Sequence, residues 1–253
     1  MTDFHVIIPA RLQSMRLEAK ALKLIGDKPM ILHVCDQAAQ SGAKSVTVAT
    51  DDQQIVEAVE KAGFKAVMTR NDHASGSDRV YEAAELVNLS NDDIIVNVQG
   101  DEPFIPPDNI RLVASLLSGN KSEMATLCCP INSVEEALDS NAVKVVFNQE
   151  GLALYFSRSL IPFNRNHPVE LDKPLIGNYF RHIGIYAYRK SFLKSFIGWP
   201  QSELEKTESL EQLRVLENGG SIGIASLDEL PPPGVDTPED LRKAREYYSS
   251  ISQ

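Results

Sequence analysis

The sequence predicts an α/β fold built on a doubly wound, mostly parallel sheet. Short β-rich runs alternate with helix-like segments through the first half of the chain. The runs at 5–10, 45–49 and 93–98 are almost continuously apolar, which is typical of parallel strands covered on both faces. Right-handed crossovers make such a sheet doubly wound, and its ligands lie beyond the carboxyl ends of the strands.

The other elements follow in order along the chain. Helix-like periodicity and one further β-rich run predict helices at 29–41, 52–62, 76–87 and 108–118, and a strand at 65–68. Two apolar runs flank a turn-rich spacer and predict a hairpin, with strands at 143–147 and 152–156. The last third predicts a strand at 182–188, a helix at 207–217, a strand at 221–226 and a final helix from 237. Thr237 is a natural N-cap for that helix and Pro238 a natural first residue.

The chain shows no internal repeat and no low-complexity linker, so we expect a single domain over 1–253. Within it, an insertion at about 130–215 contains the hairpin and a candidate surface for a second copy of the chain. Residues 162–178 hold three prolines and no clear period, which predicts a long, lid-like loop.

Composition narrows the function. The formal net charge of −10 argues against nucleic-acid or anionic-membrane partners, so a cluster of cations in this chain is expected to bind a small anion. The start of the chain lacks a basic-then-apolar leader, and no apolar run approaches bilayer length, so we expect a cytoplasmic protein. Cys35, Cys128 and Cys129 have no metal-ligand spacing and are expected to be buried.

The first strand runs into a loop that carries Arg11, Ser14, Arg16 and Lys20. The sequence contains neither G-x-G-x-x-G nor G-x-x-x-x-G-K-[ST], so side-chain cations are expected to bind phosphate where backbone amides do so in those motifs. A solvated basic loop is the alternative that this segment alone leaves open.

Acidic residues follow other strands. Asp101 is a candidate magnesium ligand. It comes directly after Gly100, whose lack of a side chain lets the backbone approach closely. Asp236 is the second candidate, although a residue just before an N-cap reads equally well as structural. For Glu102, balancing the dipole of the next helix is the favoured role, and for Asp52, capping a helix is favoured.

Two further groups of polar residues suit a second substrate. Ser75 and Gly76 could present polar groups to a base edge or phosphate, although capping by Ser77 would explain the same residues. Arg158, His182 and Arg214 could donate hydrogen bonds to an anionic, hydroxyl-rich molecule. Glu211 and Arg214 could equally form a surface pair on one helix.

Taken together, these segments closely resemble the bacterial CMP-Kdo synthetases, the 3-deoxy-manno-octulosonate cytidylyltransferases. The matching stretches run in order along nearly the whole chain: IIPAR with the S-x-R-L-x-x-K spacing, KPMI, VATDD, MTRNDHASGSDR, IIVNVQGDEP, NAVKVV, ALYFSRSLIPF, RHIGIYAYR, ESLEQLRVLENG and PPPGVDTPEDL. The resemblance implies a sugar-nucleotide transferase fold and a homodimer. It also implies transfer of CMP from CTP to the anomeric hydroxyl of Kdo, with release of pyrophosphate and magnesium as cofactor.

The resemblance also implies roles for single residues. The CTP phosphates would be bound by Arg11, Ser14, Lys20 and Arg16, and the cytidine would be surrounded by Ser75, Ala10 and Gln99. Magnesium would be held by Asp101 and Asp236, and Kdo by Gln99, Arg158, His182, Tyr186 and Glu211. Lys20, Arg11 and Asp101 would be the catalytic residues.

One stretch departs from the family pattern. The usual S-T-R-L-P-G-K is replaced here by a loop with Glu18 and Ala19 at the Pro-Gly positions. This change bears on the conformation of the loop and on its charge near CTP. The alternatives to a Kdo-specific enzyme are the same chemistry on another ulosonic acid, such as an amino-Kdo or a sialic acid, and an inactive nucleotide-binding homologue.

Overall fold

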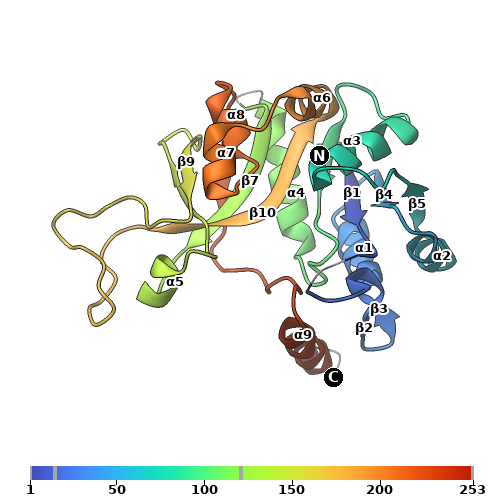
Figure 1. Cartoon of the computed structure of the whole chain (residues 1–253), viewed down its shortest axis with the longest axis horizontal. Helices are drawn as coiled ribbons and strands as arrows, with labels where there is room; N and C mark the ends of the chain where they lie inside the picture. The colour runs from blue at the N-terminus through green and yellow to red at the C-terminus, as the bar shows by residue number, and fades with distance from the viewer. Residues whose placement is uncertain (1, 14–15, 120–121, 252–253) are drawn as a thin grey trace.

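A computed structural model describes residues 2–13, 16–119 and 122–251 of the chain. Its described part contains a nine-stranded sheet with helices on both faces (Figure 1). The main strand order is β11-β7-β10-β6-β1-β4-β5, and only β10 runs against its neighbours along this path. The predicted doubly wound, mostly parallel sheet is therefore confirmed, with one antiparallel strand at its centre.

The parallel half supplies the strand ends that matter for the site. Its strands are β1 (Phe4–Ala10), β4 (Ser45–Thr50), β5 (Lys65–Met68) and β6 (Ile94–Asn97). On β1, Val6 and Ile8 pack into one apolar cluster, while Ile7 packs into another on the opposite face. Both faces are covered, which is why this strand has no polar alternation.

Helices of the first half cover these two faces. They are α1 (Met30–Gln40), α2 (Gln53–Lys61), α3 (Gly76–Leu86) and α4 (Pro107–Ser115). A 3-10 turn, η1 (Lys20–Leu22), and the small pair β2 (Leu24–Ile25) and β3 (Lys28–Pro29) precede α1, and η2 (Leu116–Gly119) follows α4. Each predicted element of this half is present, with ends that differ by a few residues.

The second half extends the sheet. Its strands are β7 (Met124–Pro130), β8 (Lys144–Phe147), β9 (Ala153–Ser157), β10 (Phe180–Arg189) and β11 (Ile222–Ser226). The predicted hairpin is confirmed, because β8 and β9 pair antiparallel across a turn in which Asn148 Oδ1 accepts from the backbone N–H of Glu150 and of Leu152. Residues 158–179 contain no helix or strand and, together with the hairpin, form an arm that projects from the body (Figure 1).

The helices of this half differ from expectation at one place. They are α5 (Val134–Leu138), α6 (Lys190–Gly198), α7 (Glu203–Glu208), α8 (Leu213–Glu217) and α9 (Pro238–Ile251). The single helix predicted at 207–217 is wrong: Ser202 caps α7 in a capping box with Glu205, and Ser209 at φ 52 ends it before α8 begins. Neither β7 nor α6 was among the expected elements.

The last helix begins as predicted. Asp240 N donates to Thr237 Oγ1 over 3.2 Å, and Thr237 N donates to Asp240 Oδ2 over 2.9 Å, so the two residues cap α9 reciprocally. None of the helices in the described part is long and apolar enough to cross a bilayer. The three cysteines are buried and unbridged, which confirms their predicted placement.

Candidate active site

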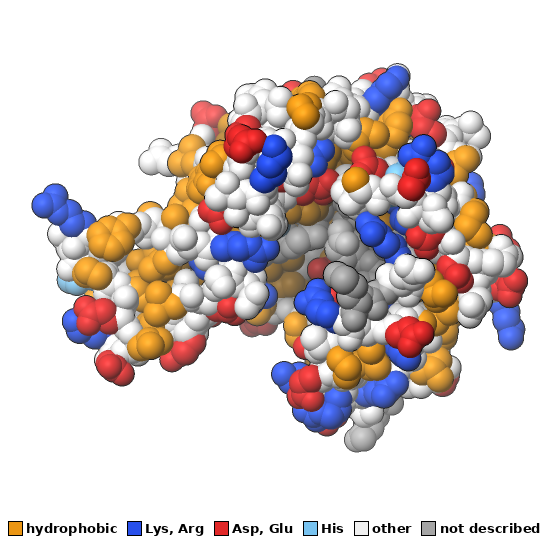
Figure 2. All heavy atoms as spheres, in the orientation of Figure 1, with side chains coloured by type: hydrophobic (Ala, Val, Ile, Leu, Met, Phe, Trp, Pro, Cys, Tyr) orange, Lys and Arg blue, Asp and Glu red, His pale blue; other side chains and the backbone are white. Residues whose placement is uncertain are grey.

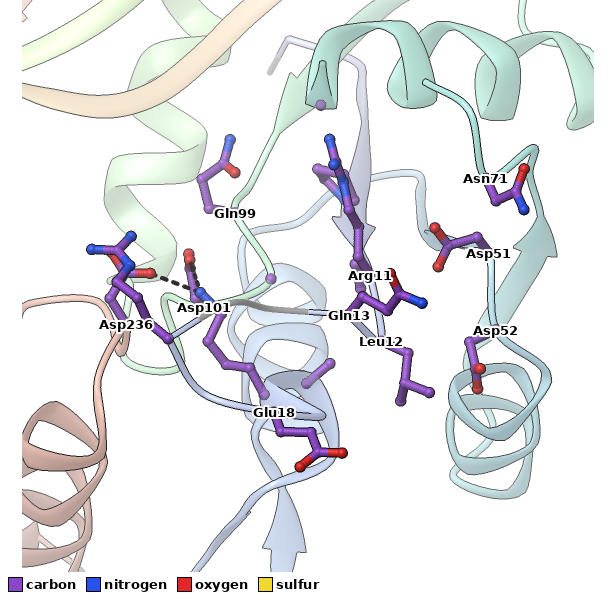
Figure 3. Close-up of a pocket in the computed structure, with 17 residues that line it drawn as sticks. Arg11, Leu12, Gln13, Glu18, Asp51, Asp52, Asn71, Gln99, Asp101 and Asp236 are labelled. Atoms are coloured by element: carbon purple, nitrogen blue, oxygen red, sulfur yellow. Dashed lines mark hydrogen bonds and ion pairs between the residues drawn. The ribbon is translucent and has the colours of Figure 1, made fainter. Parts of the chain in front are cut away.

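A cavity of about 1010 Å³ opens where the carboxyl ends of β1, β4 and β6 meet. Its walls come from the loop after β1, the loops after β4 and β6, and the segment before α9 (Figure 3). The predicted site residues that line it are Ala10, Arg11, Arg16, Lys20, Gln99, Asp101 and Asp236. The rule that ligands lie beyond the carboxyl ends of such strands therefore locates this cavity correctly.

Lys20 joins three distant parts of the chain at the edge of this cavity. Its Nζ donates to Asp101 Oδ2 over 2.6 Å and to Asp236 Oδ1 over 2.8 Å (Figure 3). Arg16 donates to the other oxygen of Asp236 over 2.9 Å. Burial lowers the pKa of Lys20, but the charges of the two carboxylates outweigh it and hold this pKa above its usual value.

Close backbone contacts bring the two carboxylates together. A Cβ on Gly100 would lie 2.9 Å from the carbonyl oxygen of Pro9, so only glycine lets the loop after β6 lie against the end of β1. The backbone N–H of Val235 donates to the carbonyl of Asp101 over 2.8 Å, which fixes the segment before α9 beside the same loop. The close approach expected at Gly100 is thus present.

Glu18 and Ala19, the two residues that depart from the family pattern, belong to the loop after β1 that forms part of the cavity wall. Ala19 has φ 50 and ψ 38, the left-handed conformation that favours glycine, and its carbonyl accepts from Leu22 N over 2.9 Å. Glu18 lines the cavity and adds a negative charge to its wall. Ser14 lies outside the described residues.

The cations of the cavity differ in what they already bind. Among the described residues, Arg11 has no ion-pair partner, whereas Arg16 and Lys20 are paired with aspartates. Asp51 and Asp52 also line the cavity. Because it has no internal carboxylate partner, the guanidinium of Arg11 is the cation best able to bind an incoming anion.

Asp51 and Asp52 have structural partners. Asp51 accepts from Arg79 over 2.7 Å, and the Arg79 side chain is only 1% exposed and also donates to Thr69. Asp52 caps α2 by accepting from Gln54 N over 2.8 Å, as predicted. Sequence reasoning did not single out Arg79 or Asp51. One signal was available in the sequence: Arg79 lies on the same helical face as the apolar Val80 and Ala83, which indicates that its charge is buried and needs a partner.

The start of α3 borders the cavity through Gly76. Ser75 is the N-cap, in a capping box with Asp78, so the alternative that Ser77 supplies the cap is wrong. Ser77 instead donates to Glu211 Oε2 over 2.9 Å. The hydroxyl of Ser75 therefore has a structural role at the helix start, and its contact with a nucleotide stays a prediction.

A second polar cluster lies on β10 and the segment before α8. The rings of His182 and Tyr186 have centroids 5.4 Å apart. Burial, aided by the charge of Arg181, lowers the pKa of His182 to about 3, so the imidazole is neutral. Burial and the charge of Glu211 raise the pKa of Tyr186, and burial raises that of Glu211 itself. Three of the predicted sugar-binding residues thus form one cluster.

The two arginines predicted to donate to a substrate have different partners within the protein. Arg158 donates to the carbonyls of Glu208, Ser140 and Ser209, over 2.7, 3.1 and 3.4 Å. Arg214 forms a bidentate pair with Glu205, with distances of 2.7 and 2.6 Å, and its guanidinium carbon lies 4.8 Å from the ring centroid of Phe196. The expectation that Arg214 is available to a substrate is therefore not supported by its contacts.

Known proteins resemble this chain along almost its whole length. A family model described as cytidylyltransferase matches residues 5–223. The 3-deoxy-manno-octulosonate cytidylyltransferase of Photobacterium profundum is 51% identical over 243 residues, covering 96% of this chain and 98% of the relative. This chain belongs to the 3-deoxy-manno-octulosonate cytidylyltransferase family.

Other members of the cytidylyltransferase family match as fully. The enzyme of the same name from Colwellia psychrerythraea is 49% identical over 263 residues, covering 99% of this chain and 94% of the relative. A solved structure titled CMP:2-keto-3-deoxy-manno-octonic acid synthetase complexed with CTP superposes with a TM-score of 0.89 at 42% identity. That match covers 98% of this chain and 99% of the other and confirms the predicted nucleotidyltransferase fold.

Proposed function

We propose that this protein transfers CMP from CTP to 3-deoxy-D-manno-octulosonate, Kdo, to form CMP-Kdo and pyrophosphate. The product would supply activated sugar for lipopolysaccharide. One observation carries the proposal: Arg11, Lys20 and Asp101 converge at one cavity. The chain in which they do so is 51% identical to a 3-deoxy-manno-octulosonate cytidylyltransferase. Two substrates follow from the reaction, CTP and Kdo.

The reaction needs alignment and positive charge more than covalent chemistry. When the anomeric hydroxyl of Kdo attacks the α-phosphorus, negative charge develops on the phosphoryl oxygens and on the departing pyrophosphate. In this proposal Arg11 and Arg16 bind the phosphates, and Lys20 stabilises the developing charge. The two hydrogen bonds from Lys20 to aspartates hold its ammonium in place before CTP arrives.

Magnesium is part of the proposal, and the donor set fits it. Oxygens of Asp101 and Asp236 already converge on a single ammonium, so the fold can direct both toward one cation. In the described part of the chain, no group of three metal-ligating side chains occurs, so the other ligands would be phosphate oxygens and water, as magnesium prefers. When bound, the ion would neutralise charge on the phosphates.

The polar cluster on β10 is the proposed Kdo site. His182, Tyr186 and Glu211 offer hydrogen-bonding groups to a hydroxyl-rich sugar, and Gln99 extends toward the CTP cavity from the end of β6. Arg158 supplies positive charge for the sugar carboxylate. We assign cytidine contacts to Ala10, Gln99 and Ser75, as the family resemblance implies.

A homodimer completes the proposal. Large apolar side chains are exposed along the arm, with Phe163 at 73%, Leu171 at 66% and Leu154 at 60% (Figure 2). A second copy of the chain would remove this surface from water. We also infer a cytoplasmic location, because CTP is a cytoplasmic nucleotide.

Pyrophosphate release tests the activity directly. With CTP, magnesium and Kdo, we expect turnover that disappears when the sugar is omitted. An acceptor panel at equal concentration, with amino-Kdo and a sialic acid, then tests specificity, and a clear preference for another sugar would replace Kdo in the proposal. CTP binding without turnover on any acceptor would favour an inactive homologue.

A further inference from the structure

A bulge in β10 separates two residues of the proposed Kdo site. Ile183 pairs with Leu127 of β7, whereas Tyr186 pairs with the adjacent Thr126, so Gly184 and Ile185 have no counterpart on β7. Bulges redirect side chains and are frequent beside active sites. This one gives His182 and Tyr186 their ring contact of 5.4 Å although the two are four residues apart.

The hydroxyl of Thr126 lies inside this bulge. Thr126 is fully buried. Its Oγ1 lies 2.7 Å from the carbonyl oxygen of Ile185, 3.0 Å from that of Ile183 and 2.9 Å from Nε2 of His182. One side chain therefore contacts the backbone carbonyls on both sides of Gly184 and the histidine just before the bulge.

The number of protons in this cluster fixes the direction of its hydrogen bonds. A threonine hydroxyl carries one proton and two lone pairs, and both carbonyl oxygens can only accept. If Nε2 of His182 were unprotonated, Oγ1 would face three acceptors with a single proton. If Nε2 is protonated, it donates to Oγ1, and Oγ1 shares its own proton between the carbonyls of Ile183 and Ile185. Only in the second arrangement is a proton available to each of the three contacts of Oγ1.

We propose that Thr126 is a positioning residue that fixes His182 as the Nε2–H tautomer, which leaves Nδ1 as an acceptor for a hydroxyl or amine of the sugar. The part of this inference that concerns the sugar rests on the proposed function. None of the described residues hydrogen-bonds Nδ1, and His182 retains 9% exposure. A neutral ring has one donor and one acceptor, so holding Nε2 as the donor determines the other nitrogen.

Two observations support this assignment. Burial lowers the pKa of His182 to about 3, which excludes the doubly protonated ring near neutral pH. The edge contact with Phe156, with centroids 5.0 Å apart and planes at 81°, holds the ring plane. His182 thus selects for a proton donor on the substrate and against a carboxylate or carbonyl oxygen at the same place, because two acceptors would repel each other.

The tautomer can be measured without any substrate. Nitrogen NMR of the full-length, histidine-labelled protein distinguishes a protonated from an unprotonated ring nitrogen, and a His182→Gln sample assigns the signal. We expect protonated Nε2 and unprotonated Nδ1 in the wild-type protein, the same in Thr126→Ser, and a mixture in Thr126→Val. A wild-type ring protonated at Nδ1 would overturn the inference, whether or not the protein turns over CTP.

Kinetics test the consequence for the sugar. Thr126→Val should raise the KM for Kdo about twofold if the two tautomers are equally populated, and at most about tenfold if the Nε2–H tautomer is lost altogether, while the KM for CTP stays the same. Thr126→Ser should restore the wild-type KM. Thr47→Val is the matched control, because Thr47 is buried on β4 and is 1% exposed, and it should leave both KM values unchanged.

The outcomes separate this inference from the proposed function. If the wild-type protein releases no pyrophosphate with any acceptor, the proposed function fails and the NMR result still decides the role of Thr126. If turnover is normal and Thr126→Val leaves the KM for Kdo unchanged, the substrate contact at Nδ1 is wrong. A loss of affinity in Thr126→Val that serine does not rescue would mean that packing, and not the hydroxyl, is responsible.

Discussion

Lys20 and Asp101 are 81 residues apart in sequence, and the Nζ of Lys20 lies 2.6 Å from Oδ2 of Asp101. Lys20 comes from the loop after the first strand, and Asp101 from the loop after a central one. Their contact means that the cation proposed to stabilise phosphate charge and the acid proposed to hold magnesium are positioned by each other. A change in either residue is expected to disturb both functions.

Asp101→Asn should keep the fold and lower turnover by about 10²- to 10³-fold, a loss typical of removing one strong electrostatic interaction from an active site. The reason is that the amide binds both Lys20 and magnesium less strongly. Pyrophosphate release at saturating CTP measures the change, with a thermal melt to check folding. Asp52→Asn is the control, since Asp52 lines the same cavity and asparagine also caps helices. Near-normal magnesium-dependent rates would remove Asp101 from the proposed ligands.

Ala19→Gly should stabilise the protein by up to about 1 kcal/mol, because Ala19 holds a positive φ of 50 that glycine adopts without a steric cost. Urea unfolding measures the difference. Ala62→Gly is the matched control: Ala62 is exposed, follows α2 and has φ −84, so glycine there should destabilise. Effects of the same sign at both positions would contradict strain at Ala19.

Acid should destabilise the protein through His182. Its pKa is lowered from 6.5 to about 3 by burial, with a smaller contribution from Arg181 on the same strand. Between these values the unfolded chain binds a proton that the folded protein does not, so stability falls as the pH decreases, by at most about 1.4 kcal/mol per pH unit. Denaturant titrations from pH 7 to pH 4 (about the accessible range) test this. His182→Gln should flatten the profile, and an unchanged slope would assign the effect to other groups.

Arg214→Met should destabilise the protein by about 3–5 kcal/mol, because it leaves the carboxylate of Glu205 buried without its partner. Both side chains of the pair are largely buried, at 12% and 5% exposure. Arg242→Met is the control: Arg242 forms its ion pairs on the exposed face of α9, and its loss should leave the unfolding midpoint unchanged. A stable Arg214→Met protein with a raised KM for Kdo would instead support substrate binding by Arg214.

Phe163→Asp should weaken self-association if the arm is the dimer surface. Phe163 is 73% exposed, and a charge there would have to be desolvated in any interface that covers it. Sedimentation velocity over a concentration series measures the shift toward monomer. Leu86→Asp is the control, since Leu86 is 51% exposed at the end of α3, outside the arm. A dimer equally stable in both variants would place the interface elsewhere.

The sequence predicts the parallel half of the fold well, because strands covered on both faces have an unmistakable composition. Ile7 and Ile8 pack into opposite clusters, and that arrangement is visible as an unbroken apolar run. The break at Ser209 is different, since a left-handed serine carries no local signal comparable to glycine. The helix-like sequence pattern therefore continues through Ser209, although the helix itself ends there.

The site was predictable to the extent that it follows from topology. The meeting of Arg11 and Asp101 at one cavity follows from the carboxyl-end rule for parallel strands. The contact of Asp236 with Lys20 spans 216 residues and depends on how the segment before α9 returns to the sheet, which no local pattern encodes. The bulge at Gly184 is different, since an isolated glycine inside a strand pattern indicates a bulge, but the contact of its carbonyls with Thr126 depends on the pairing with a neighbouring strand.

The hydrogen bond from Val235 to the carbonyl of Asp101 has a consequence for synthesis of the protein. A ribosome releases the strands of the parallel half long before it reaches residue 236, so the nascent chain can form the central sheet while Lys20 still lacks its second carboxylate. The acidic pair is assembled only when the final segment has left the exit tunnel and docked. Under the magnesium role proposed for Asp236, a chain that has not yet reached this residue lacks one of the two proposed metal ligands.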